Sequence, residues 1–195
     1  MFMTLIWVAI GVVAAAAFVA WRVYSTYQAT NNMIVALDQR CNTALADIDV
    51  HLKHRHNLIP GLVEVVKGVK GHETEMVLGI VQARTEALKA LQGNIKLKAE
   101  GNLTAQIGTL LSSAEKSPEL RALPEFANLR NELKACEERI TAARRFYNLA
   151  IEEYNIAIRQ FPGNKIATKM RLSTRQPFDL GVERVLIDEP LALSF

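Results

Sequence analysis

The sequence predicts an all-α protein, with an N-terminal transmembrane helix followed by an antiparallel helical bundle of three long helices and one or two short ones. An uncharged apolar run opens the chain, and apolar residues recur at helical spacing over most of the rest. The 195 residues include only 10 glycines and 6 prolines. A strand-rich fold needs turn residues every ~8–12 positions, so this composition disfavours one.

The apolar run predicts a single membrane span. Residues 1–21 carry no charged side chain, and Arg22 is the first. As a helix, Met3 to Trp21 extends about 28 Å, close to the ~30 Å hydrocarbon core of a bilayer. Trp21, Tyr24 and Tyr27 have the amphipathic rings typical of the headgroup layer. We therefore expect the chain to contact the lipid bilayer through residues 3–21. A cleaved signal peptide stays open as the alternative, although no basic segment precedes the run.

Charge asymmetry predicts the orientation of the span. No basic side chain precedes it, whereas Arg22 and Arg40 follow it. The positive-inside rule therefore favours an external N-terminus and a cytoplasmic domain at the inner membrane. Cys41 and Cys136 are two isolated cysteines rather than a disulfide framework, which agrees with a reducing compartment.

The expected organisation is an anchor at 1–23, a helical bundle at 24–161 and an irregular tail at 162–195. No Gly or Pro lies between Arg22 and Asn57, so the span is expected to run on into the first bundle helix. Pro60 predicts a turn at 57–60 and a second helix over 60–91. A polar loop over 93–101, a third helix over 102–114 and a short turn of helix between Pro118 and Pro124 are expected next.

The clearest helical pattern lies over residues 126–161. Apolar or aromatic residues recur there at alternating steps of three and four, at Phe126, Leu129, Leu133, Cys136, Ile140, Ala143, Tyr147, Ala150, Tyr154, Ala157 and Phe161. This spacing predicts one long helix whose seam faces a bundle core. A homo-oligomeric coiled coil remains open as the alternative.

Three segments resemble the LemA family. The first is HLKHRHNLIPGLV at 51–63, followed by Lys67-Gly68 and His72-Glu73. The second runs from Glu138 to Asn148 and ends in ARRFYN, and the third is Tyr154-Asn155 followed by FPGN at 161–164 and Ile166-Ala167. The resemblance implies a bacterial membrane protein with one N-terminal helix and a cytosolic helical bundle, and it carries over no catalytic residues. Asn57 and Gly61 depart from the family pattern, which has Asp and Asn at these places.

All four histidines, His51, His54, His56 and His72, lie within 22 residues of one another. A helical hairpin at Pro60 would bring His51 and Asp47 towards His72 and Glu73, and such a set suits several divalent metals. No recognised ligand motif is present, and Lys53 and Lys67 oppose a cation. We therefore expect no residue of this chain to serve as a metal ligand.

Helical spacing places Glu73 or His72 in a seam, where a buried carboxylate needs a partner. We expect an inter-helix pair that fixes register, with Arg139, Arg144 and Arg145 as candidate partners for Glu73.

Asn148 and Asn155 each follow a seam tyrosine and are placed to hydrogen-bond across the seam.

A basic run, Lys165, Lys169, Arg171 and Arg175, has no intervening acidic residue. Anionic headgroups would attract such a run at a bilayer, and a solvated tail is the alternative. The 23 basic and 20 acidic side chains nearly balance, so a nucleic-acid partner is not expected.

The predicted function is a non-enzymatic scaffold or partner-binding module at the cytoplasmic membrane, without catalytic residues or cofactors and with protein partners still unidentified. Two alternatives stay open: a metal-dependent or small-molecule-binding protein using His51, His72 and Glu73, and a membrane-remodelling protein.

Overall fold

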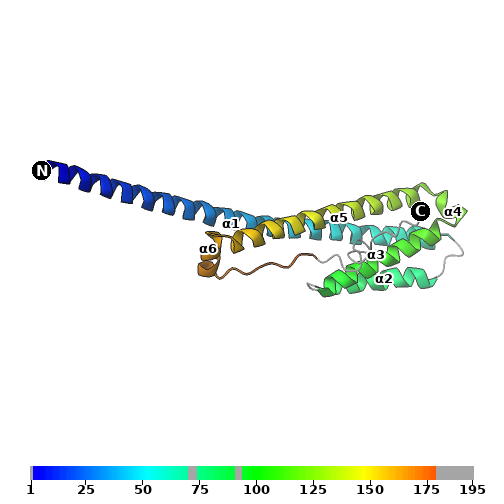
Figure 1. Ribbon diagram of the computed structural model, residues 1–195. Coiled ribbons are helices and arrows are strands. Elements are labelled where there is room, and N and C mark those ends of the chain that lie inside the picture. Colours follow the sequence, from blue (N-terminus) through cyan, green and yellow to red (C-terminus); the bar gives the residue numbers. More distant parts are fainter. Residues whose placement is uncertain (1, 70–73, 91–93, 179–195) are drawn as a thin grey trace, which may run out of the picture. The chain divides into compact units, whose positions relative to one another are not determined.

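The computed structural model describes residues 2–69, 74–90 and 94–178 and is shown in Figure 1. These residues form six helices and no strand, which confirms the all-α prediction. The helices are α1 (Phe2–Lys67), α2 (Thr74–Lys89), α3 (Asn94–Ala114), α4 (Pro118–Arg121), α5 (Pro124–Arg159) and α6 (Gly163–Met170).

The first part of α1 is long and apolar enough to cross a membrane, and none of its apolar window is buried against the rest of the protein. Phe2 and Trp7 are 85% and 70% exposed. Soluble proteins rarely expose apolar surface on this scale, so the segment fits a membrane anchor. The helix continues unbroken from the span into the domain, as the sequence predicts.

The predicted turn at 57–60 is wrong, because α1 passes through Pro60 and ends at Lys67. A proline inside a helix leaves the carbonyl four residues earlier without its N–H donor. That carbonyl belongs to His56, and the Nε of Arg84 in α2 donates a hydrogen bond to it at 2.9 Å. The lost backbone bond is thus replaced by a side chain from another helix.

The predicted loop at 93–101 is also wrong, because α3 begins at Asn94. Its inward row includes Glu100, Leu103 and Ile107, all buried. Because the inward residue Glu100 is charged, the apolar spacing that would predict a helix is interrupted at the start of α3. The short helix α4 confirms the predicted turn of helix, and its Ser117 cap accepts a hydrogen bond from the N–H of Leu120.

The chain divides into two compact units. Unit 2 comprises residues 48–142, and its core lies among α1, α2, α3, α4 and α5. The most buried members of this core are Ile59, Leu62, Val66, Ile80, Leu103, Leu110, Ala114, Leu120, Phe126 and Leu133. The helices α2 and α3 pack against each other within this unit.

Unit 1 comprises residues 1–47 and 143–195. Its core lies between α1 and α5, with Ile34, Cys41, Ala44, Tyr147, Ala150, Tyr154 and Ala157 buried. The predicted seam of the long helix is therefore confirmed over its length, except that Phe161 at its end is 79% exposed.

The helix α6 occupies part of the segment predicted to be irregular. It is only 8 residues long, so Ile166 and Ala167, both buried, are too few to show a helical period. Gly163 begins it where an added Cβ would lie 2.0 Å from the carbonyl oxygen of Ala157, so only glycine fits. After Arg171, with a left-handed φ of 55°, residues 172–178 run without helix.

Candidate functional site

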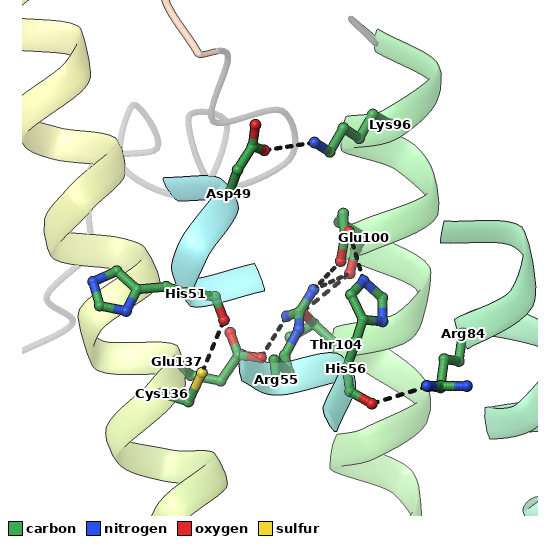
Figure 2. Close-up of polar contacts among 10 residues, drawn as sticks. All are labelled: Asp49, His51, Arg55, His56, Arg84, Lys96, Glu100, Thr104, Cys136 and Glu137. Carbon is green, nitrogen blue, oxygen red and sulfur yellow. Dashed lines mark hydrogen bonds and ion pairs between the residues drawn. The ribbon is translucent and has the colours of Figure 1, made fainter. Parts of the chain in front are cut away.

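The most buried charged group in the described residues is Arg55 of α1, in unit 2. Its guanidinium lies between the carboxylates of Glu100 in α3 and Glu137 in α5, as Figure 2 shows. It also donates to the hydroxyl of Thr104 at 2.6 Å. We call these residues, with His56, the Arg55 cluster. One side chain thus joins three helices through charge-assisted hydrogen bonds.

Glu100 is the central anion of the cluster, with its side chain 3% exposed. One of its oxygens accepts from Arg55, and the other lies 3.0 Å from Nε2 of His56. Burial alone would raise the pKa of this carboxyl, but the hydrogen bond from His56 and the positive charge of Arg55 outweigh burial and lower it. Glu100 therefore stays ionised with both of its oxygens occupied.

The geometry of the Arg55 cluster favours a structural role. Arginine does not deprotonate in proteins, and both Glu100 oxygens are already hydrogen-bonded. Two buried atoms, Nε of Arg55 and Nδ1 of His56, have no hydrogen-bond partner within the described residues. A buried ion pair of this kind fixes which helix faces meet, because removing one member leaves the other charge uncompensated.

The candidate metal set of Asp47, His51, His72 and Glu73 lies only partly within the described residues. His72 and Glu73 lie at 70–73, outside those residues. His51 is half-buried, and its backbone carbonyl accepts a hydrogen bond from the Cys136 thiol at 3.3 Å. His54 is exposed, whereas His56 belongs to the Arg55 cluster. Within the described ranges no group of three or more His, Cys, Asp or Glu side chains could hold a metal ion.

The expected pairing of Glu73 with an arginine stays a prediction, since Glu73 lies outside the described residues. An inter-helix ion pair does occur, but it uses Arg55 and Glu100, which the sequence reading missed. The available signal was the position of Glu100, three residues before Leu103 and seven before Ile107 on an otherwise apolar row.

Unit 1 contains a second polar arrangement, in which α5 holds the tail by its backbone. The amide of Asn155 donates to the carbonyl of Arg175 at 2.9 Å and accepts from its N–H at 2.9 Å. Asn148 makes the same pair of bonds with Phe178, at 3.0 and 2.7 Å. We call these four residues the tail clamp. The asparagines bind the tail rather than a facing helix.

In the tail clamp, the spacing of the two asparagines along α5 matches the spacing of their two partners along the tail. Seven residues of helix separate Asn148 from Asn155, which is a rise of about 10.5 Å. Three residues of extended chain separate Arg175 from Phe178, which is about 10 Å. Asparagines two helical turns apart therefore lie opposite residues three apart in the extended tail.

Side chains of the tail add anchors beyond the clamp. Arg175 donates to Asp38 and to Asn42 of α1, each at 2.8 Å, and its guanidinium lies over the Tyr154 ring. The Phe178 ring packs edge-on against Tyr147, with ring centroids 6.0 Å apart. The tail is thus fixed by contacts with both α1 and α5.

Comparison with known proteins gives the family. The sequence profile of the LemA family matches residues 44–190, which is most of the chain. The chain belongs to the LemA family. Both the Arg55 cluster and the tail clamp lie inside the matched LemA region.

Two curated relatives of this LemA chain are the magnetosome proteins MamQ 2 and MamQ 1 of Paramagnetospirillum magneticum. Each is 24% identical over 184 residues, covering 81% of this chain and 66% of the relative. This LemA chain therefore spans a little under two thirds of the length of these relatives. The segments that carry the resemblance include Asn148 and Asn155, which hydrogen-bond the tail backbone, and Gly163, which packs against Ala157.

Proposed function

We propose that this LemA-family chain is a non-enzymatic scaffold anchored in the cytoplasmic membrane, which binds an amphipathic helix of a partner protein on unit 1. The observation that carries the proposal is an exposed apolar row on the side of α5 that the described part of the tail, up to Phe178, leaves uncovered. The relatives are named magnetosome proteins, and that name assigns no partner to this chain.

The row lies away from the tail clamp by helix geometry. Phe146 and Glu153 precede Asn148 and Asn155 by two residues each, which is about 200° around the helix. Phe146, Leu149 and Ile156 are 43%, 56% and 45% exposed. We call this surface the open face. It comprises Phe146, Leu149, Glu153 and Ile156 of α5, together with Arg40 of α1, which contacts Glu153 and Phe146, and Met33, which lies about two helical turns before Arg40 on the same side of α1.

The spacing of the open face suits a helical partner. Residues 146, 149, 153 and 156 follow steps of three, four and three, which is the spacing of a helix-packing seam. Arg40 pairs with Glu153 at 2.6 Å and lies over the Phe146 ring, so the charges at the centre of the face cancel. Aromatic residues, Met and Arg are enriched in protein interfaces, and the face combines all three.

Photo-crosslinking in native membranes tests the proposal. A photoreactive residue at Met33, which is 49% exposed, is expected to give one reproducible protein adduct. Leu149→Glu with Ile156→Glu should abolish that adduct, because carboxylates would be buried against an apolar helix. The matched control, Thr174→Glu with Gln176→Glu, adds the same charge at exposed tail positions and should leave it unchanged.

Adducts with lipid alone, or with a second copy of this chain alone, would contradict the proposal. An adduct that survives the Leu149 and Ile156 substitutions as well as it survives the control would also contradict it.

A further inference from the structure

We propose a second binding surface in unit 1, a membrane-side rim that docks on the anionic headgroups of the bilayer in which α1 is anchored. The rim comprises Phe161, Lys165, Lys169, Met170 and Arg171, at and around α6. The rim shares no residue with the open face, and its ligand is phospholipid. This proposal therefore does not depend on the existence of a protein partner.

The position of the rim along α1 brings it to the outer edge of the headgroup layer. The ammonium of Lys169 lies 5.7 Å from the centre of the Tyr27 ring. Tyr27 follows Trp21 by six residues, a rise of about 9 Å. A headgroup layer is ~5–8 Å thick on each side of the hydrocarbon core. In Figure 1 α6 lies at the end of α5 nearer the N-terminus of α1.

The charge of this part of unit 1 has one sign. Residues 1–37 and 154–178 contain no Asp or Glu. The basic side chains in the same two stretches are Arg22, Arg159, Lys165, Lys169, Arg171 and Arg175. The carboxylates next along each helix, Asp38 and Glu153, are already paired with Arg175 and Arg40. Among the described residues of unit 1, a surface rich in positive charge thus begins where the span ends.

Exposed apolar side chains accompany these cations. Phe161 is 79% exposed and Met170 is 44% exposed, each close in sequence to a lysine or arginine. Interfacial protein segments combine apolar side chains that enter the headgroup boundary with cations that meet the phosphates. Gly163 holds the start of α6 against Ala157, so the rim is fixed to the end of α5.

The test measures contact between residue 170 and lipid in the full chain. Cys41 and Cys136 are replaced by alanine, and Met170→Cys carries an environment-sensitive dye. The protein is reconstituted in vesicles of phosphatidylcholine, with or without phosphatidylglycerol. Quenching by lipids that are spin-labelled at the headgroup is expected to be about two-fold stronger with phosphatidylglycerol, and high salt should reduce it.

Charge reversal supplies the matched comparison. Lys165→Glu, Lys169→Glu and Arg171→Glu together should remove the gain in quenching. Lys53→Glu, Lys116→Glu and Lys134→Glu change the net charge equally at exposed positions of unit 2 and should retain it. The circular dichroism of the helices checks that each variant folds. The quenching measurement is repeated with Lys165→Glu alone, which changes a single exposed side chain.

Equal quenching in the two vesicle types would overturn the proposal. So would an equal response of the rim variant and the control variant, or quenching at residue 170 no greater than at a dye on Leu149→Cys of the open face.

Discussion

The Nε of Arg84 donates a hydrogen bond of 2.9 Å to the backbone carbonyl of His56, the acceptor that Pro60 leaves without a partner. This contact connects α2 to α1 about one turn before Pro60. A side chain from another helix thus satisfies the acceptor that Pro60 leaves open within the 66-residue α1.

Replacing Arg84 with alanine should lower the free energy of unfolding by about 1–3 kcal/mol, because a buried carbonyl would lose its donor. Urea unfolding in detergent measures this loss. Pro60→Ala restores the backbone N–H, so Arg84→Ala should cost much less in that background. An equal cost in both backgrounds would show that Arg84 does not compensate for Pro60, and Arg121→Ala is the exposed arginine control.

Glu100→Gln should destabilise unit 2 by about 1–3 kcal/mol, since the fully buried Arg55 loses the more buried of its two carboxylates and keeps Glu137. Adding Arg55→Met should recover most of that loss, because the buried guanidinium is removed and the Glu137 side chain, 33% exposed, stays partly hydrated. Thermal unfolding of both variants checks this. A double variant less stable than Glu100→Gln alone would refute the uncompensated-charge explanation.

The lowered pKa of Glu100 sets the sign of an acid dependence. Its folded pKa lies below the ordinary 4.5, so the unfolded state binds the proton more tightly. The stability contributed by Glu100 is therefore complete above pH 4.5 and is lost as the pH falls through the lowered folded value. The difference in unfolding free energy between wild type and Glu100→Gln should shrink over that acid range, measured by urea titrations. A constant difference would be the contrary result.

Asn155→Ala should loosen the tail by about 1–2 kcal/mol, because two hydrogen bonds to Arg175 disappear. Trypsin should then cleave after Arg175 about 5–20-fold faster, since cleavage requires the tail to leave the clamp. The exposed Asn131→Ala serves as control. Unchanged cleavage would mean that the asparagine does not hold the tail.

The sequence predicts the fold where apolar spacing is regular. The seam from Phe126 to Ala157 was readable because almost every inward position of α5 is apolar or aromatic. The prediction failed at Pro60 and at the start of α3, where Arg84 and Glu100 satisfy groups that look incompatible with a buried helix. Such compensation joins residues far apart in sequence, so local patterns do not show it.

Less of the candidate site could be predicted. Asn148 and Asn155 stood out beside two seam tyrosines, but their partner is an extended backbone, which has no side-chain signature. Arg55 was one basic residue among several in a histidine-rich stretch. Its burial depends on Glu100 and Glu137, which reach it from two other helices.

The central proposal, a domain anchored by one span and held in the cytoplasm, is tested most directly by labelling single cysteines in intact spheroplasts. In a chain with Cys41 and Cys136 replaced by alanine, the exposed positions Phe2→Cys and Val50→Cys are treated with a membrane-impermeant maleimide. We predict that residue 2 is labelled in intact spheroplasts and residue 50 only after lysis. Labelling of residue 50 in intact spheroplasts would contradict the cytoplasmic placement.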